Sequence, residues 1–127
     1  MKTYPTLEDI IWAHTACIEA HGGPPGVRDV QVVDSASARP QATFDGQALY
    51  VRFEEQAAAL FESLCKNHGF VDGNKRVALA TLLGFIDING YTLETDDDEL
   101  IDLTLGMAEN RYAREDVVRW LEIRLKS

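Results

Sequence analysis

Residues 77–88 read VALATLLGFIDI, and this segment decides the fold of the chain. Apolar side chains occupy nearly every side of a helix drawn through it, so no broad face of that helix is suited to water. A helix with this composition is normally surrounded by other helices. The sequence therefore predicts that Val77 to Ile88 form the central and most buried helix of the protein.

Five more helices are expected around the central one. In each of them apolar residues recur every three or four positions, and capping residues, glycine or proline mark the ends. The apolar stripe that begins at Phe53 extends to His68, which predicts that this histidine points inward. The flanking helices are expected at residues 7–20, 29–38, 53–64, 97–108 and 114–125. The predicted fold class is all-α, a compact bundle of about six helices in a single domain spanning residues 1–127.

A short hairpin is the only strand structure that the sequence suggests. Residues 39–50 read RPQATFDGQALY, and Asp45-Gly46 is the dipeptide most typical of a tight hairpin turn. We therefore expect a small exposed flap between the second and third helices. The flap consists of Thr43, Phe44, Asp45, Gly46 and Gln47.

Composition and charge exclude several classes of protein. Hydrophobic residues make up 46% of the chain and charged residues 26%, as in an ordinary globular domain. The formal net charge of −9 disfavours direct nucleic-acid binding, because a protein that follows a phosphate backbone needs surplus Lys and Arg. The longest charge-free apolar run, residues 77–86, is about half of a membrane span, and no leader segment is recognisable. We expect a cytoplasmic protein with no membrane contact.

The two cysteines allow two interpretations. Cys17 and Cys65 lie in separate apolar segments, which favours reduced thiols in a reducing compartment. His14 stands three residues before Cys17 and His68 three residues after Cys65, so two helices could present four zinc ligands. Cysteine more commonly acts as a small buried hydrophobic residue, and we favour that interpretation.

Directly before the central helix, residues 68–76 read HGFVDGNKR. Gly73 and Asn74 lie where the loop must turn into the helix, and the first amides of a helix have no internal acceptors. Those amides and the helix dipole favour an anion such as phosphate. Lys75 and Arg76 add two cations in the first turn, where they oppose the dipole unless an anion is bound. The segment therefore predicts a phosphate-binding site.

Two further residues of this segment suit a transfer reaction. Asp72 offers a hard oxygen ligand beside the phosphate site, and a magnesium ion bound mainly by phosphates and water needs only one or two carboxylates. An imidazole side chain can exchange a proton near neutral pH, so His68 is suited to accept the proton of an attacking hydroxyl. Local roles are also open to these residues: Asp72 as a helix cap, Asn74 as a turn former and His68 as a core histidine. Those local roles do not explain why all of these residues gather at one helix start.

The segment HGFVDGNKR resembles the signature of the Fic/Doc superfamily, which runs His, any, Phe, any, acid, Gly or Ala, Asn, Gly or Lys, Arg. It is most similar to the Doc branch, the death-on-curing toxins, because Lys75 stands where the adenylyltransferase branch has glycine. The resemblance continues in YPTLEDI, HGGPPGVRD and NGYTLETDDDEL, and it covers nearly the whole chain. It implies an all-α toxin of a bacterial toxin–antitoxin pair.

The resemblance also implies a reaction: transfer of phosphate from ATP, with Mg²⁺, to a hydroxyl of a translation factor, elongation factor Tu being the expected target. By position, His68 is implied to be the general base and Asp72 the magnesium ligand. The nucleotide phosphates are implied to bind Gly73, Asn74, Lys75 and Arg76. The flap at residues 43–47 is implied to hold the target as an added strand, and a helical segment of a small antitoxin to lie in a groove of the toxin.

Several departures from the family pattern bear on the reaction. Leu79 stands where adenylyltransferases carry a second arginine, which disfavours AMP transfer. Gly69 replaces the family proline, which predicts a less rigid loop, and Ala80 replaces a residue that is polar in some Doc proteins. Some members of the superfamily carry a self-inhibiting helix that reads Ser or Thr, three residues, Glu, then Gly or Asn. The only Glu followed by Gly or Asn here is Glu109, and Leu105 stands at the hydroxyl position, so inhibition is expected from a separate antitoxin. An adenylyltransferase and a non-catalytic nucleotide- or antitoxin-binding module remain alternatives.

Overall fold

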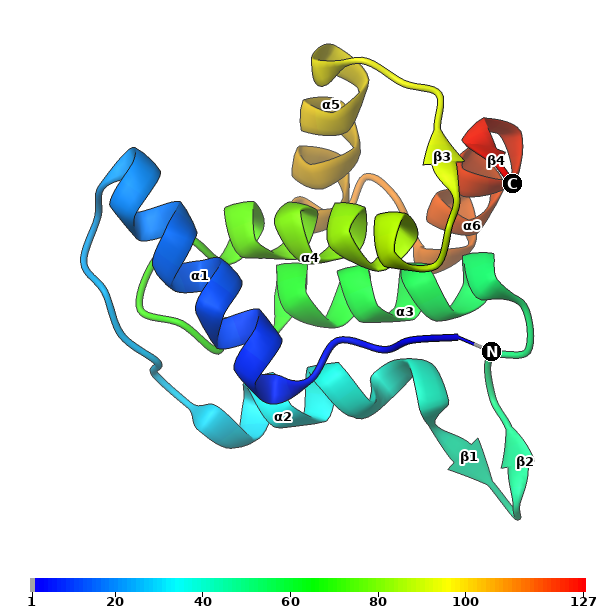
Figure 1. The fold of residues 1–127 in the computed structure, drawn as a ribbon, viewed down its shortest axis with the longest axis horizontal. Coiled ribbons are helices and arrows are strands. Elements are labelled where there is room, and N and C mark those ends of the chain that lie inside the picture. The colour runs from blue at the N-terminus through cyan, green and yellow to red at the C-terminus, as the bar shows by residue number, and fades with distance from the viewer. Residues whose placement is uncertain (1) are drawn as a thin grey trace.

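The computed structural model of the protein describes residues 2–127 (Figure 1). Within that range six α-helices follow one another, and two small two-stranded sheets lie between and beyond them. The helices are α1 (Leu7–His21), α2 (Val30–Ala38), α3 (Phe53–Lys66), α4 (Asn74–Ile88), α5 (Asp97–Ala108) and α6 (Arg114–Arg124). No helix in residues 2–127 has the length and apolar character needed to cross a membrane. The all-α class is confirmed.

The centre of the bundle is the antiparallel pair α3 and α4 (Figure 1). Nine of the 14 residues of α3 are buried, against six of 15 in α4. The prediction that Val77 to Ile88 form the most buried helix is therefore wrong. The cause is a stripe of Ala80, Gly84 and Ile88, which repeats at helical spacing and stays exposed beside α1. The helix is apolar on this side although no other helix covers it.

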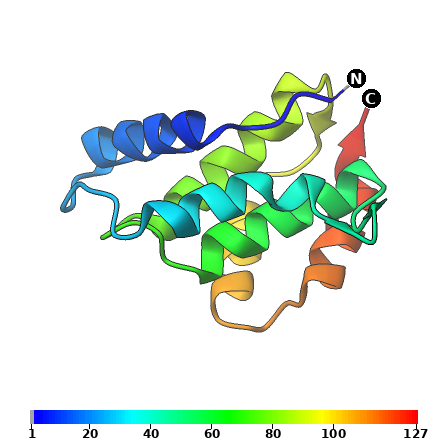
Figure 2. The same ribbon diagram turned by 90° about the horizontal axis from the view of Figure 1, so that it is seen from below.

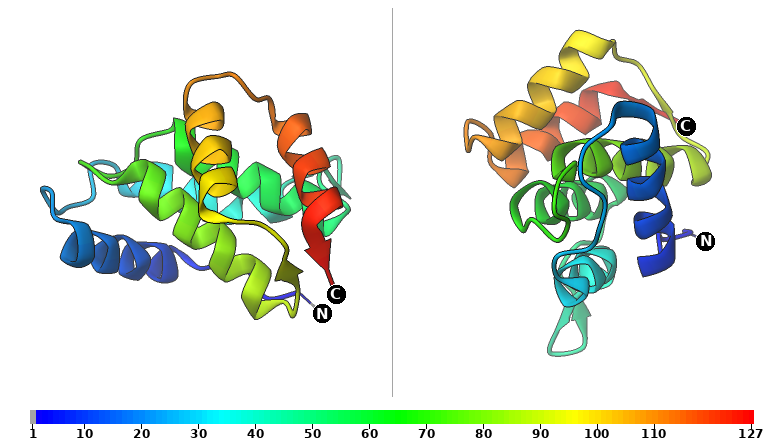
Figure 3. Two further views of the ribbon diagram at one scale, coloured as in Figure 1. Left: turned by 90° about the horizontal axis from the view of Figure 1, so that it is seen from above. Right: turned by 90° about the vertical axis from the view of Figure 1, so that its left-hand side faces the viewer.

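The remaining helices cover the α3–α4 pair from two directions. Helices α1 and α2 lie on one side of the pair, and α5 and α6 lie on the other (Figures 2 and 3). Phe61 from α3, Phe85 from α4 and Phe70 from the loop between them are almost fully buried in one core. Burying such a side chain stabilises the fold by about 1.5–3 kcal/mol. Phe70 thus anchors the loop that precedes α4.

The predicted hairpin is present. Strands β1 (Thr43–Phe44) and β2 (Gln47–Ala48) pair antiparallel, with Thr43 opposite Ala48. Asp45 and Gly46 both have positive φ angles, of 52° and 76°, as a tight hairpin turn requires. Both strands are exposed to solvent. The second sheet, β3 (Thr92–Leu93) with β4 (Leu125–Lys126), was not predicted, because strands of two residues leave no periodic pattern.

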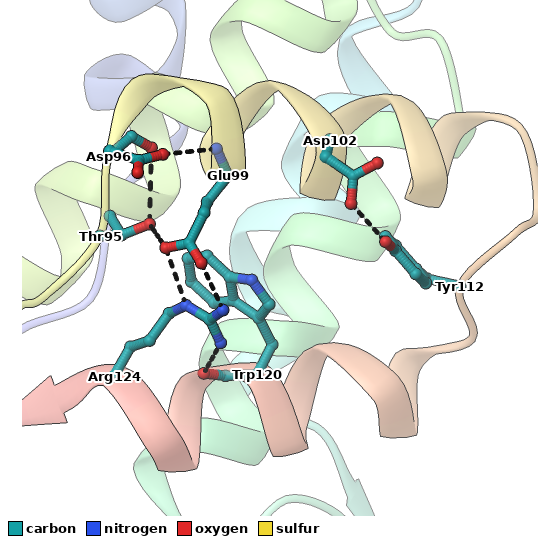
Figure 4. A network of polar contacts seen from close by, with 7 residues as sticks. All are labelled: Thr95, Asp96, Glu99, Asp102, Tyr112, Trp120 and Arg124. Atoms are coloured by element: carbon teal, nitrogen blue, oxygen red, sulfur yellow. Dashed lines mark hydrogen bonds and ion pairs between the residues drawn. The ribbon is translucent and has the colours of Figure 1, made fainter.

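A polar network ties α5 to α6 (Figure 4). The guanidinium of Arg124 donates to both carboxylate oxygens of Glu99, at 3.2 and 2.8 Å, and to the main-chain oxygen of Trp120. The hydroxyl of Thr95 also donates to Glu99, at 2.8 Å. These hydrogen bonds, those from Arg124 first, lower the pKa of Glu99 from 4.5 to about 2. The network fixes the start of α5 against the last turn of α6.

This network predicts a specific loss of stability in acid. The folded-state pKa of Glu99 lies below its unfolded value, so its contribution is fully present above pH 4.5 and disappears as the pH falls toward 2. We expect Glu99→Gln to melt below the wild type above pH 4.5, with the difference shrinking to nothing near pH 2. Thermal melts across that pH range measure it. Glu19→Gln, at an exposed position of α1, is the control and should show no such convergence.

Candidate anion-binding and transfer site

A cavity of about 660 Å³ opens at the N-terminal end of α4. It is lined by residues from the end of α3 and the loop that follows, from the first turn of α4 and from the end of α5. The lining residues are Cys65, His68, Val71, Asp72, Gly73, Asn74, Lys75, Arg76, Leu105, Ala108 and Glu109. All six residues predicted for catalysis, metal binding and phosphate binding therefore meet at one cavity.

The side chain of His68 lies at this cavity, but its orientation differs from the predicted one. Helix α3 ends at Lys66, Asn67 caps it, and His68 has a left-handed φ of 49°. This reversal turns the chain off the helical stripe, so the side chain of His68 is exposed and does not point into the core. The prediction of an inward histidine is wrong for that reason. The side chain borders the cavity and is open to solvent, as a proton acceptor for an external hydroxyl must be.

The first turn of α4 contains main-chain N–H groups that have no hydrogen-bond acceptor within residues 2–127. These are the main-chain N–H groups of Asn74, Lys75 and Arg76, whereas the first helical bond runs from Val77 to Gly73. The amide of Gly73 is already occupied, because it donates to Oδ1 of Asp72 at 2.8 Å. Free amides at a helix start are the usual ligands of phosphate and sulfate.

The side chain of Asn74 serves the loop. Its Oδ1 accepts from the main-chain N–H of Phe70 at 3.0 Å, and its Nδ2 donates to the main-chain oxygen of Phe70 at 3.0 Å. Both ends of the amide are thus engaged with one residue of the loop. In this arrangement Asn74 offers its main-chain N–H to an anion and uses its side chain to hold the loop closed.

The two cations of the first turn lack acidic partners. Lys75 and Arg76 are exposed, and neither forms an ion pair with any of residues 2–127. Glu109, the other acid on the cavity wall besides Asp72, pairs with Arg111 at 3.2 Å. The cations therefore face the positive end of the helix dipole without compensation. Burial raises the pKa of Cys65, which also lines the cavity, to about 12, so its thiol stays protonated and contributes no negative charge.

Asp72 keeps one oxygen available. Its Oδ1 accepts from Gly73, and Oδ2 has no hydrogen-bond partner among the described residues. This single carboxylate oxygen beside the free amides suits Mg²⁺, which takes one or two carboxylates and fills its other positions with phosphate oxygens and water. The four residues considered as zinc ligands do not form such a cluster: within residues 2–127 no three His, Cys, Asp or Glu side chains gather around one point.

The segment between α1 and α2 supports the loop through hydrogen bonds that the sequence did not predict. The amides of Arg28 and Asp29 both donate to the main-chain oxygen of Gly69, at 2.8 and 3.0 Å. The amide of Val71 donates to Gly26 at 3.1 Å, and the guanidinium of Arg28 donates to the main-chain oxygen of His68 at 2.9 Å. The loop expected to be less rigid is thus held along its length by hydrogen bonds.

Close packing against Val33 leaves no room for a side chain at Gly69. A Cβ atom added there would lie 2.5 Å from Cγ2 of the buried Val33. We expect Gly69→Ala to lower the free energy of unfolding by roughly 1–3 kcal/mol, because neither group can move away cheaply. The double variant with Val33→Ala should be less destabilised than the sum of the two single substitutions, as a double-mutant cycle of urea melts would measure. Strictly additive effects of the two substitutions would contradict the packing explanation.

Anion binding at this site should stabilise the fold. At ten times its dissociation constant, phosphate should add about 1.4 kcal/mol and raise the melting temperature by a few degrees, since it compensates Lys75 and Arg76. Thermal melts in phosphate, compared with chloride at equal ionic strength, measure the gain. The variant Lys75→Ala/Arg76→Ala should melt higher than the wild type without phosphate and gain little from it. An equal gain in both proteins would place the anion elsewhere.

The flap does not reach this cavity. None of residues 43–48 lines it, and the hairpin lies at the opposite end of α3 from the loop that carries His68 (Figure 1). A helix of 14 residues is about 21 Å long. The implied role of Thr43 to Gln47 in docking a target beside the site is therefore not supported by the geometry. The segment that borders Asp72 is the turn at Gly23, where an added Cβ would lie 2.8 Å from Oδ2.

Comparison with known proteins identifies relatives over most of the chain. The Fic/DOC family matches residues 4–92. Toxin Doc of Mycolicibacterium smegmatis is 47% identical over 98 residues, which cover 77% of this chain and 73% of the relative. The protein kinase doc of Escherichia phage P1 is 37% identical over 101 residues, which cover 80% of this chain and 79% of the relative. The matched region contains the cavity loop and the first turn of α4.

Proposed function

This chain belongs to the Fic/DOC family, and from that membership we propose that it is the toxin of a bacterial toxin–antitoxin pair. The proposed activity is transfer of the γ-phosphoryl group of ATP to a hydroxyl of a translation factor, with elongation factor Tu as the first candidate. Two relatives, one named a toxin and the other a protein kinase, support the toxin role and the phosphate transfer in this proposal. Halted translation would be the result.

The observation that carries the proposal is the uncompensated positive charge at the start of α4. Free amides at Asn74, Lys75 and Arg76 and two unpaired cations suit the phosphate groups of a nucleotide. His68, on the same cavity, accepts the proton of the attacking hydroxyl. The hydroxyl oxygen then forms a bond to the γ-phosphorus while the bond to the bridging oxygen breaks, and ADP leaves. The cations and amides stabilise the charge on the transferred group.

Asp72 is the residue proposed to hold Mg²⁺, through the oxygen that has no partner among the described residues. When bound there, the metal ion would neutralise charge on the phosphate oxygens. Asp72 would contribute through its charge and its position, which the amide of Gly73 fixes at 2.8 Å.

Labelled ATP tests the proposed reaction. We expect label from the γ-phosphate to appear on the target, and label from the α-phosphate to stay in the nucleotide. The reverse pattern would mean AMP transfer, which the apolar Leu79, packed against the core, does not favour. Transfer of neither label, with nucleotide still bound, would mean a binding module. The His68→Ala protein is the blank for each assay.

The apolar groove between α1 and α4 is the proposed site of the antitoxin helix. It has a volume of about 470 Å³ and contains the exposed stripe of α4 together with Trp12, whose side chain is 75% exposed. Thr81 borders the groove, and its buried hydroxyl has no hydrogen-bond partner within residues 2–127. An amphipathic helix would cover the apolar stripe and could offer a partner to this hydroxyl.

Substitution in the groove tests that assignment. Gly84→Arg should prevent the cognate antitoxin from neutralising growth inhibition, because a long charged side chain would fill the groove. Ile123→Arg is the matched control, since Ile123 is 71% exposed on α6 and does not line the groove. Toxicity without antitoxin should be the same for both variants. Normal neutralisation of Gly84→Arg would place the antitoxin on another surface.

A further inference from the structure

His14 is the buried histidine of this chain, and the proposed reaction does not use it. The chain has three histidines, and His21 and His68 are exposed while His14 is 3% exposed in the middle of α1. Its Nε2 lies 2.7 Å from the main-chain oxygen of Asp72. A carbonyl oxygen can only accept, so Nε2 must carry a proton and donate it. The contact therefore fixes the ring orientation.

The same ring holds the loop at a second point. The imidazole of His14 stacks on the ring of Phe70, with centroids 3.9 Å apart and planes 11° from parallel. Phe70 is the residue whose main chain is bonded in both directions by the side chain of Asn74. The side chain of His14 thus contacts the loop at two residues, by stacking on Phe70 and by a hydrogen bond to Asp72.

The bonded carbonyl belongs to the peptide between Asp72 and Gly73. A peptide unit is planar, so fixing its oxygen also fixes the direction of its N–H group. That N–H, on Gly73, donates to Oδ1 of Asp72 and thereby orients the carboxylate. Gly73 caps α4 with a left-handed φ of 78°, so the same peptide precedes the free amides. His14 therefore contacts the peptide that lies between the Asp72 carboxylate and the first residues of α4.

We infer that His14 is a positioning residue of the anion site: its Nε2–H holds the Asp72–Gly73 peptide in the orientation that presents the Asp72 carboxylate and the amides of α4 to one ligand. Only the activity part of the test rests on the proposed phosphate transfer. The binding part needs no more than inorganic phosphate.

Two substitutions separate donation from stacking. His14→Phe keeps a ring against Phe70 and removes the donor. His14→Gln removes the ring and places an amide N–H near the position of Nε2. His21→Phe, at an exposed position in the last turn of α1, is the control. For each protein, NMR titration with inorganic phosphate at amides 73–76, thermal melts, and kcat and KM for magnesium ATP would be measured.

We expect His14→Phe to fold, to bind phosphate about tenfold more weakly and to show a similar rise in KM with a smaller change in kcat, as the loss of one hydrogen bond implies. His14→Gln should recover most of the affinity, and His21→Phe should match the wild type. If His14→Phe binds phosphate as well as the wild type, or if His14→Gln is as weak as His14→Phe, the inference is wrong.

A spectroscopic measurement covers the case in which the variants do not fold. The Nε2–H proton of wild-type His14 should be protected from exchange, and its resonance should move when phosphate is added. A resonance that stays unchanged while amides 73–76 shift would overturn the inference. A wild type that binds phosphate with this response but transfers no label would reject the proposed kinase activity and leave the role of His14 standing.

Discussion

His68→Ala should abolish phosphate transfer and growth inhibition while leaving nucleotide affinity nearly unchanged. A general base typically contributes about 10²–10⁴-fold to the rate, and the base acts on the acceptor hydroxyl, not on ATP. The structure makes the variant easy to interpret, because the side chain of His68 is exposed and its removal leaves no cavity in the core. We therefore expect the melting temperature to stay within about 2 °C of the wild type.

The transfer rate, the ATP affinity and the melting temperature would be measured on one purified preparation of the His68→Ala protein. The control is His21→Ala, which removes another exposed imidazole on a surface away from the cavity lining. Near wild-type transfer by a folded His68→Ala protein would end the proposed mechanism. Loss of both transfer and ATP binding would mean that His68 acts in binding, and the role of general base would have to be given up.

Asp72→Asn should weaken magnesium-dependent ATP binding as well as transfer, by on the order of 10²-fold in the transfer rate. Asparagine keeps an oxygen that can accept from Gly73, so the hydrogen bond of 2.8 Å that shapes the loop can persist while the charge is lost. The effect then tests the proposed metal-binding role of the carboxylate separately from any collapse of the loop.

ATP titrations with and without Mg²⁺ would show the difference. The wild type should gain affinity on adding Mg²⁺, whereas Asp72→Asn should gain little. Asp72→Ala, which also removes the acceptor for Gly73, should lose stability in addition. An Asp72→Asn protein that still responds fully to Mg²⁺ would show that the metal ion binds through other groups.

The sequence predicted those parts of the site that depend on residue type and local position. The order of the helices, the Asp45-Gly46 turn and the gathering of Asp72, Lys75 and Arg76 at the start of α4 all follow from periodicity, capping and helix electrostatics. Each of these features depends on a few neighbouring residues, so it can be predicted from the local sequence.

The parts that were missed depend on contacts between distant segments. The bond from His14 to Asp72 joins residues 58 positions apart, and the bonds from Arg28 to the loop span about 40, so no local pattern reveals them. Burial of α4 was overestimated because the apolar residues of its exposed stripe look the same in sequence as core residues. The direction of His68 was missed because one left-handed residue ends a stripe that the periodicity would continue.

The distance between the hairpin and the cavity makes the tip of the hairpin a useful attachment point. Asp45 and Gly46 form an exposed turn, and the whole length of α3 separates them from the loop that carries His68 (Figure 1). Exposed loop tips of this kind tolerate insertions well. A fluorophore or an affinity tag placed there would let the protein be immobilised and followed in single-molecule or surface-based assays with the cavity at the start of α4 facing solution.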